Sequence, residues 1–408
     1  MKFIVVQIGA RRGYAVPTIL EKSGMLERFY TDLCADVGLG RILAAGQYLP
    51  GIGGKLRRLA ARRLPPEIRQ KTFTFTVPML RHGIKLMSGS KNPADRFREH
   101  LRWSSDLGNA MTCAGFGHAT HVFSMFGEGG PFLMEAKQRG LKVISEIYIL
   151  FSTEWILAAE RKQFPDWEPE QTDYASIRRE FPDANGLQTQ TDFAICPSEA
   201  VHDDLVNHNG ILRERGVVVP YGMNPKLLEL QPQPQRGRVL FVGTAELRKG
   251  IHYLAMAAEK LVARNIRCEI RVAGNVTREI ARRMECRHLH FLGRVPRERI
   301  AAEYQQADVF VLPSLAEGSA EVTYEALAAG VPTITTRAAG SVVRDGIEGR
   351  IVPERDAIAL AEAIEELVEN RALRERMGVA ARERARDYTW ERYGERLVAA
   401  LTQFETGK

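Results

Sequence analysis

The feature of this sequence that most constrains its fold is an alternation of short apolar runs with amphipathic stretches of helical period. The apolar runs are rich in Val, Ile and Leu, and helical patterns such as 129–140 and 251–265 separate them. Because strands that are apolar throughout are buried on both faces, this pattern predicts parallel sheets covered by helices on either side. The expected strands are 3–8, 121–125, 142–147, 192–196, 216–220, 238–243, 268–274, 307–313 and 331–336.

The chain has 408 residues, which is too long for one ordinary core, so we expect two domains. A Pro/Gln-rich stretch at 231–238 interrupts the alternation, and it is either an interdomain linker or a surface loop. We expect an N-terminal domain over 1–222 and a C-terminal domain over 223–387, each an α/β unit with a doubly wound parallel sheet. We predict that the last segment, 388–408, forms a helix that packs back on the N-terminal domain.

Composition excludes several classes of protein. The hydrophobic fraction of 45% and the charged fraction of 26% are those of a soluble globular protein, and no apolar run approaches the roughly 18 residues of a membrane span. The first residues have the pattern of a strand rather than of a signal peptide. The five cysteines form no CxxC pair, and their number is odd. A cytoplasmic protein is therefore expected.

The segment 41–102 stands outside the alternation, and its charge is unusual. It contains fourteen Lys/Arg against three acids, a net charge of +11, whereas the whole chain carries +7. Apolar and basic residues are interleaved in it. We favour a surface for peripheral contact with the inner face of an anionic membrane, or for an anionic acceptor. A nucleic-acid surface and a solvated excursion are the other interpretations, and no nucleic-acid-binding motif is present.

The stretch 317–332, EGSAEVTYEALAAGVP, places two carboxylates eight positions apart in a run that is otherwise small or apolar. Glu317 follows an expected strand and so lies on the loop at its carboxyl end. Ser319 is the predicted N-cap of a helix that carries Glu325 in its second turn. The N–H groups of 318–322 and the positive end of this helix predict an anion site. A carboxylate beside an anion site predicts a ligand that also offers neutral hydroxyl groups, as a sugar does.

Several ordered motifs resemble one family. They are the E-x7-E stretch followed by ALAAGVP, FVGTAELRKG at 241–250, FLGRVPRERIAAEYQQADVFVLPS at 291–314, AAGSVVRDGIEGRIVP at 338–353 and YTWERYGERL at 388–397. Together they resemble the retaining glycosyltransferases of family 4, which are also called glycosyl transferases group 1. The N-terminal half resembles that family mainly at CPSEAV (196–201) and VVVPYGMN (217–224). The resemblance implies the GT-B fold, in which two Rossmann-like domains face each other across a cleft.

The resemblance also implies roles for particular residues. Glu317 would hold hydroxyl groups of the donor sugar, Glu325 the ribose hydroxyls of the nucleotide, and Lys249 the departing diphosphate. A fixed cation and backbone donors would stabilise the charge that develops on that diphosphate. The remaining donor-binding candidates are Gly13, Gly243, Thr244, Arg294, Val295, Gly318, Ser319, Ala320, Glu321 and Val322.

Two departures from the family pattern concern the charges of the site. The family commonly has Arg where this chain has Thr244, and the missing cation would come from Arg248 or else from Arg11 or Arg12. The family often has a histidine near the acceptor where this chain has Tyr148. Glu146 lies two residues earlier, on the same side of the strand, and joins the acceptor-side candidates.

The resemblance predicts a retaining enzyme that moves a sugar from a UDP- or GDP-sugar to a cell-envelope glycan, a lipid-linked oligosaccharide or a glycolipid. The nucleotide sugar is a substrate, and no metal or other cofactor is expected. One alternative is a GT-B synthase or phosphorylase that acts on a small soluble sugar. The other is a non-catalytic scaffold for glycan biosynthesis.

Two groups of possible metal ligands have simpler interpretations. His118 and His121 lie just before or within an expected strand, and Cys286, His288 and His290 lead into another. Neither group has further ligands at the spacing of a zinc site, so structural roles are expected.

Overall fold

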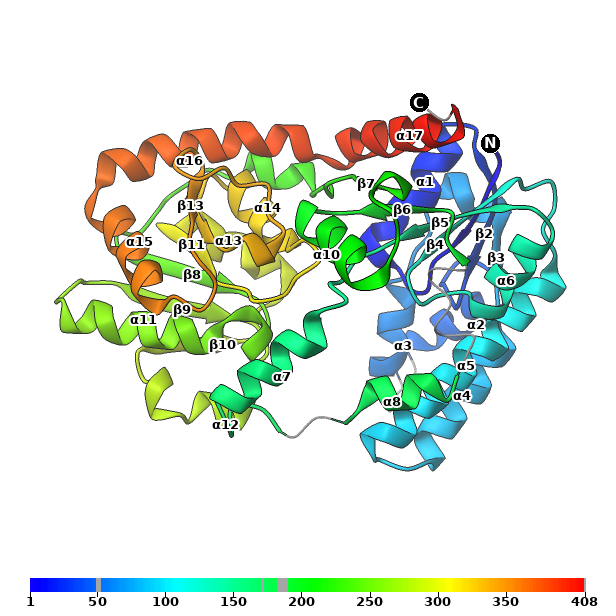
Figure 1. Ribbon diagram of the computed structural model, residues 1–408, viewed down its shortest axis with the longest axis horizontal. Helices are drawn as coiled ribbons and strands as arrows, with labels where there is room; N and C mark the ends of the chain where they lie inside the picture. The colour runs from blue at the N-terminus through cyan, green and yellow to red at the C-terminus, as the bar shows by residue number, and fades with distance from the viewer. Residues whose placement is uncertain (49–52, 170–171, 182–189, 407–408) are drawn as a thin grey trace.

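The computed structural model describes residues 1–48, 53–169, 172–181 and 190–406. Within those residues it contains two parallel sheets, with strand orders β3-β2-β1-β4-β5-β6-β7 and β10-β9-β8-β11-β12-β13. The two sheets lie side by side in Figure 1, each covered by helices on both faces. No helix in the described part of the chain is long and apolar enough to cross a bilayer. The basic segment's residues 49–52 and the final residues 407–408 lie outside the described part.

The first sheet is built around β1, whose alternate side chains face opposite layers of helices. Phe3 and Val5 share a buried cluster with α1 and α17, whereas Ile4 and Val6 share another with α5 and α6. The strands are β1 (Phe3–Val6), β2 (Leu26–Thr31), β3 (Thr72–Thr74), β4 (His121–Met125), β5 (Lys142–Glu146), β6 (Phe193–Cys196) and β7 (Gly216–Val218). The helices of this region are α1 (Ala15–Lys22), α2 (Leu39–Ala45), α3 (Gly53–Ala60), α4 (Thr76–Ser88), α5 (Pro93–Ala114), α6 (Gly130–Gln138), α8 (Tyr174–Arg179) and α10 (Glu199–Asn209).

The second sheet is built around β8 and β11, which pair in parallel at its centre. Its strands are β8 (Arg238–Val242), β9 (Glu269–Ala273), β10 (Leu289–Gly293), β11 (Val309–Leu312), β12 (Thr333–Thr335) and β13 (Gly349–Ile351). Its helices are α11 (Ile251–Ala263), α12 (Arg278–Ala281), α13 (Arg297–Gln306), α14 (Glu321–Ala328), α15 (Ala357–Glu369) and α16 (Arg371–Ala385). In both sheets the strand order reverses beside a central strand, and the carboxyl ends of the strands at that reversal are where such folds bind ligands.

Strands lie in all nine expected ranges, and β10 lies where Cys286, His288 and His290 lead into an expected strand, but three others among the described residues are not predicted from the sequence. β2 carries the charged residues Glu27 and Arg28 in its middle, and β3 and β13 have only three residues each. The segment 41–102 stands outside the alternation in sequence, but it contributes β3, which pairs with β2 as an edge strand of the first sheet. The stretch 231–238 lies against the end of α13, where the N–H groups of Gln233 and Gln235 donate to carbonyls of that helix and its end.

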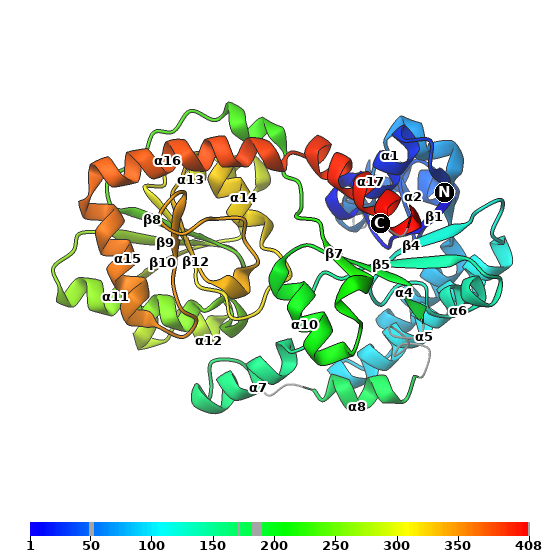
Figure 2. The same ribbon diagram turned by 45° about the horizontal axis from the view of Figure 1, so that its top comes forward.

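The last helix, α17 (Trp390–Thr406), returns to the first sheet (Figure 2). Leu397 and Leu401 are fully buried in the cluster that contains Phe3, and Gly394 lies close against Ile19 of α1. A Cβ at Gly394 would lie 3.2 Å from that isoleucine, so the absence of a side chain allows the two helices to approach each other.

A second crossing between the domains lies within the N-terminal half of the sequence. We call residues 153–168 the strap; it contains α7 (Thr153–Gln163) and packs on the second domain, as Figure 1 shows. Leu157 and Trp167 of the strap are buried in the hydrophobic core of the second domain. Before the strap, the N–H groups of Phe151 and Ser152 donate to Asp204 of α10 in the first domain.

Glu160 fixes the strap to the second domain. Its carboxylate is 1% exposed and accepts hydrogen bonds from His252 Nε2 at 2.8 Å, Tyr253 Oη at 2.6 Å and Arg355 Nε at 2.8 Å. Burial by itself would raise the pKa of Glu160, but these three donors lower it to about 2. The carboxylate therefore stays ionised, and it is the acceptor for two buried donors, His252 and Tyr253, and for the exposed Arg355.

We expect Glu160→Ala to lower the free energy of unfolding by about 3 kcal/mol, because it removes the acceptor of the buried His252 and Tyr253. Glu154→Ala, an exposed change on the same helix, is the matched control and is expected to cost no more than about 0.5 kcal/mol. Urea unfolding of the two variants and the parent measures both values. Equal stability of the two variants would contradict the role given to Glu160.

Candidate active site

The carboxyl ends of the two sheets meet in direct backbone contact. A Cβ at Gly318 would lie 1.9 Å from the carbonyl oxygen of Tyr148, so a residue with a side chain does not fit there. Ser198, at the start of α10, donates its hydroxyl to the carbonyl of Gly318 at 2.6 Å. The loops that carry the predicted donor residues therefore face the loops that carry the predicted acceptor-side residues.

Glu317 lies between two cations on the second domain. Its carboxylate forms an ion pair with Lys249 Nζ and accepts from Arg248 Nη1 at 2.8 Å, and its side chain is 12% exposed. Arg248 also pairs with Glu246 at 2.6 Å. Although burial opposes the charge of Arg248, the carboxylates of Glu317 and Glu246 raise its pKa above the ordinary value. Two fixed positive charges thus converge on one carboxylate.

Close backbone approach shapes the loop that carries these cations. Gly243 has φ +149°, and a Cβ there would lie 2.9 Å from the side chain of Lys249. A Cβ at Gly250, where φ is +70°, would lie 2.0 Å from the carbonyl of Pro313. Thr244, which stands where the resemblance implies Arg, is exposed. The second cation beside Glu317 is therefore Arg248, the nearer of the candidates proposed from the sequence.

Glu325 lies in the second turn of α14 and is half-buried. Tyr304 of α13 donates its hydroxyl to Glu325 Oε2 at 2.9 Å, and burial raises the pKa of that tyrosine well above its ordinary value. The hydrogen bond orients the carboxylate from the side away from solvent. Arg294 is exposed after β10, whereas the neighbouring Val295 packs partly on the core of the second domain.

The residues before α14 differ from the prediction in two respects. Ser319 is not the N-cap: Ala320 is, and Ser319 Oγ instead donates to the carbonyl of Gly340 at 2.8 Å. The N–H of Ala320 donates to the carbonyl of Ala339 at 3.0 Å and is unavailable to a ligand. In the part of the chain that the structure describes, no acceptor outside α14 is assigned to the N–H groups of Gly318, Ser319, Glu321 and Val322.

Arg12 links the two domains. It is part of η1 (Arg11–Tyr14), a turn in which Arg12 and Gly13 both have left-handed backbone angles, with φ of 48° and 61°. Its guanidinium pairs with Glu146 at the end of β5 and with Glu321 at the start of α14, the latter at 3.0 Å. It also stacks on the ring of Tyr221, 3.4 Å from the ring centroid. Burial opposes its charge, but Glu146, Tyr221 and Glu321, with other neighbouring groups, together raise the pKa of Arg12 well above its ordinary value.

Arg11 contacts other residues than Arg12 does, all of them in the first domain. Its guanidinium pairs with Glu128 at 3.1 Å and lies 4.9 Å from the ring centroid of Tyr148. These three residues line a cavity of about 300 Å³ between the strand ends of the first sheet, α5 and α8. Its other walls include Phe97, Trp103, Ser104, Ser105, Phe126, Arg178 and Thr191. Aromatic faces interleaved with hydroxyl groups suit a polyhydroxylated ring.

Glu128 was missed by the sequence reasoning. It follows β4, where no motif marks it, and only its position after an expected strand could have drawn attention to it. Its carboxyl is buried and accepts from the N–H of Ile8 at 2.7 Å. Burial raises its pKa to about 8, although Arg11 and the N–H of Ile8 act in the opposite direction. Near neutral pH this group is largely protonated.

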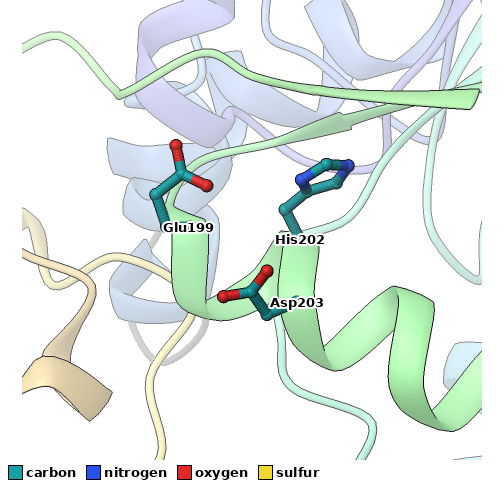
Figure 3. Close-up of side chains that lie close together, drawn as sticks. All are labelled: Glu199, His202 and Asp203. Carbon is teal, nitrogen blue, oxygen red and sulfur yellow. The ribbon is translucent and has the colours of Figure 1, made fainter. Parts of the chain in front are cut away.

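The histidines and the cysteine for which structural roles are expected belong to no group with metal-ligand geometry within the described ranges. Among the described residues, the one group with metal-ligand geometry is Glu199, His202 and Asp203 of α10, whose candidate atoms lie within 4.8 Å of one another (Figure 3). Arg213 pairs with Asp203, and its carbonyl lies 3.1 Å from His202 Nε2. The guanidinium of Arg213 therefore already neutralises Asp203, one of the three candidate ligands.

Residues 229–384 match the family model described as glycosyl transferases group 1. The whole chain also superposes on the sucrose-phosphate synthase of Thermosynechococcus elongatus with a TM-score of 0.67, at 18% identity and 100% coverage of both chains. The Anabaena protein HepE, solved with UDP and glucose, gives a TM-score of 0.60 at 14% identity over 99% of this chain and 100% of that one. The C-terminal domain belongs to the glycosyl transferases group 1. The complete chain has the GT-B fold.

Curated relatives of this GT-B chain include two that are named for inositol-containing substrates. The D-inositol 3-phosphate glycosyltransferase of Corynebacterium diphtheriae is 30% identical over 238 residues, which are 52% of this chain and 56% of that protein. The phosphatidyl-myo-inositol mannosyltransferase of Mycobacterium leprae is 35% identical over 186 residues, 43% of this chain and 50% of that protein. The chain spans about half the length of the curated relatives it matches.

The raised pKa of Glu128 gives a signed prediction for stability. From about pH 4.5 to about pH 8 the unfolded chain ionises this carboxyl while the folded chain keeps it protonated, so the free energy of unfolding falls as pH rises. Glu128→Gln cannot ionise and lacks this fall. We expect the variant to gain stability relative to the parent between pH 5 and pH 8, by on the order of 3 kcal/mol.

Urea unfolding of both proteins at the two pH values measures this gain, and Glu154→Gln, at an exposed position, is the control. Parallel pH profiles for the parent and Glu128→Gln would contradict the assignment of a protonated Glu128.

Proposed function

We propose that this protein transfers a sugar from a nucleotide-sugar donor to an acceptor hydroxyl, with retention of the anomeric configuration and without a metal ion. The observation that carries the proposal is the pair of cations, Arg248 and Lys249, that converge on Glu317 at the carboxyl ends of the strands in the group 1 domain. The nearby start of α14 adds N–H groups and the positive end of a helix dipole, and both suit a diphosphate.

The chemistry follows from where charge develops. As the bond between the anomeric carbon and the diphosphate oxygen breaks, negative charge accumulates on the leaving group, and Arg248 and Lys249 stabilise it. When Arg248 and Lys249 contact the diphosphate, the carboxylate oxygens of Glu317 accept hydrogen bonds from the hydroxyl groups of the sugar. In our proposal the acceptor oxygen bonds to the same face of the anomeric carbon, and its proton passes to the leaving phosphate oxygen. Glu325, oriented by Tyr304, binds the ribose hydroxyls.

The donor is proposed to be a UDP- or GDP-sugar. The structure of HepE contains UDP and glucose, and the name of the Mycobacterium relative specifies mannosyl transfer. These two proteins support a hexosyl donor without choosing between the nucleotides. Contacts near Arg294 and Val295 would make that choice, because they lie where the resemblance implies binding of the base.

The acceptor is proposed to be a cell-envelope glycan, a lipid-linked oligosaccharide or a glycolipid, bound on the side of Arg11 and Tyr148. Both curated relatives named above are called transferases acting on inositol phosphate or its lipid. A synthase for a small soluble sugar remains the second candidate, since the GT-B neighbour with the TM-score of 0.67 is a sucrose-phosphate synthase. Against the scaffold hypothesis, the chain has the charged side chains that stabilise a leaving diphosphate.

A membrane-linked acceptor is supported by the surface of α4. Val77, Leu80, Ile84 and Met87 recur at helical spacing and are 58%, 46%, 65% and 84% exposed. We call these four residues the α4 stripe. Exposed Arg81 and Lys85 lie within it, and Arg81 has no ion-pair partner among the residues that the structure describes. An apolar stripe with interleaved cations fits the interface of an anionic bilayer, so we propose peripheral contact through this part of 41–102.

The donor site is tested first by thermal unfolding with UDP, GDP, ADP and TDP at millimolar concentration in the presence of a chelator. A ligand at 100 times its dissociation constant stabilises the folded state by about 2.7 kcal/mol, which is several degrees. We expect one nucleotide to raise the melting temperature of the parent selectively, and Glu325→Ala to lose that shift. A cooperative transition that no nucleotide moves would contradict the proposed function.

The membrane contact is tested by sedimentation with vesicles of phosphatidylglycerol and phosphatidylcholine. We expect the parent to sediment with them, and the combined variant Val77→Ser, Leu80→Ser, Ile84→Ser and Met87→Ser to stay in the supernatant. The control removes exposed apolar residues of the second domain, Val262→Ser with Val379→Ser. Equal sedimentation of the stripe variant and the parent, or no binding by the parent, would rule out docking through the α4 stripe.

A further inference from the structure

The strap ends at the loop that carries the donor-site cations. Glu168, its last residue, accepts a hydrogen bond from the backbone N–H of Leu247 at 2.8 Å through Oε1. Leu247 begins η7 (Leu247–Lys249), a single 3₁₀ turn whose other two residues are Arg248 and Lys249. A side chain from the N-terminal half of the sequence therefore holds the first residue of the turn that carries both cations.

This turn has no cap of its own. Its N-cap residue, Glu246, makes no side-chain cap hydrogen bond, and its carboxylate is paired with Arg248 at 2.6 Å. A three-residue 3₁₀ turn has too few internal hydrogen bonds to fix its own orientation. Leu247 is fully buried, so its N–H would lack a partner without Glu168. The cap that this turn needs comes from 79 residues earlier in the chain.

Glu168 is itself held in place by the strap. Arg161 Nε donates to its second oxygen at 3.3 Å, and the Glu168 side chain is 14% exposed. The preceding residue, Trp167, is buried in the core of the second domain and lies beneath the guanidinium of Arg283 at 4.7 Å. Glu160, in α7 of the same strap, is held by His252, Tyr253 and Arg355 of the second domain. The Glu168 carboxylate is therefore held in place by the contacts of Arg161, Trp167 and Glu160 along the strap.

We propose that Glu168 is a positioning residue for the donor site, which sets Arg248 and Lys249 toward the diphosphate of the donor through the N–H of Leu247. The inference rests on the proposed function, because it assigns those cations to a diphosphate. It adds that the group 1 domain does not complete this site alone. A carboxylate contributed by the N-terminal half determines how strongly the diphosphate is bound.

The test separates the diphosphate from the rest of the nucleotide. A nucleoside contacts the base and ribose positions but not the cations, whereas the nucleoside diphosphate contacts both. The ratio of their dissociation constants therefore measures what the cation turn contributes. Isothermal titration with UDP and uridine, and in parallel with GDP and guanosine, gives this ratio for the parent and for Glu168→Ala, Glu168→Gln, Lys249→Met and the double variant Glu168→Ala, Lys249→Met.

We expect Glu168→Ala to weaken binding of the diphosphate about tenfold and to leave the nucleoside unchanged, since a hydrogen bond to a charged group is lost. Glu168→Gln, which keeps an oxygen for the N–H of Leu247, is expected to retain most of the affinity. With Lys249 already replaced, removing Glu168 should have a smaller effect, because the two residues act on the same contact. Glu154→Ala is the matched control on the exposed face of α7 and should match the parent.

Each other outcome counts against a specific claim. If Lys249→Met weakens the diphosphate but Glu168→Ala does not, the positioning role is wrong and the proposed function stands. If Glu168→Ala weakens diphosphate and nucleoside equally, or if its effect is additive with that of Lys249→Met, Glu168 is a general structural residue and the inference is wrong. If the parent binds no nucleoside diphosphate, the proposed function itself fails.

Discussion

The structure depends on one close contact, that between Gly318 and the carbonyl of Tyr148. Two sheets can present their carboxyl ends to each other only if the loops beyond those ends approach without side chains in the way. The missing Cβ at Gly318 makes this possible, and the Ser198 hydroxyl fixes the distance from the other side. Arg12 then adds an ionic link to Glu321 across the same junction. The relative position of the proposed donor and acceptor sides follows from these few atoms.

The charges of the site are balanced before any ligand binds. Lys249 and Arg248 pair with Glu317, and Arg12 pairs with Glu146 and Glu321. A phosphate that enters must therefore compete with a carboxylate that is already in place. This competition makes phosphate binding weaker than the number of cations suggests. The ion pairs, however, hold the cations in fixed positions, and fixed charges stabilise a leaving group most effectively. The carboxylate that is released is the one assigned to the sugar hydroxyls.

The sequence was most informative where burial imposes a period or where a motif is continuous. Apolar runs predicted the strands, and the segment from Glu317 to Glu325 identified the loop and helix near which the cations converge. Sequence reasoning failed where the partner lies far along the chain. Ser319 has the residue type of an N-cap, but the carbonyl of Gly340 takes its hydroxyl. Glu128 and Glu168 belong to no motif, and only the folded chain brings them to Arg11 and to Leu247. The edge strand β3 is too short for periodicity to reveal it.

The path of the strap has a consequence for how the protein is made. Leu157, Phe164 and Trp167 leave the ribosome before the second domain's core, including α11 against which Phe164 and Trp167 pack, has been synthesised. Domains generally fold in order from the N-terminus during synthesis. Here the apolar residues of the strap stay exposed until the second domain, on which they pack, has been synthesised. The first domain also requires α17, at residues 390–406, to cover the Phe3 side of its sheet. The first sheet cannot bury its full core until residues 390–406 have been synthesised, so the nascent protein exposes apolar surface until then.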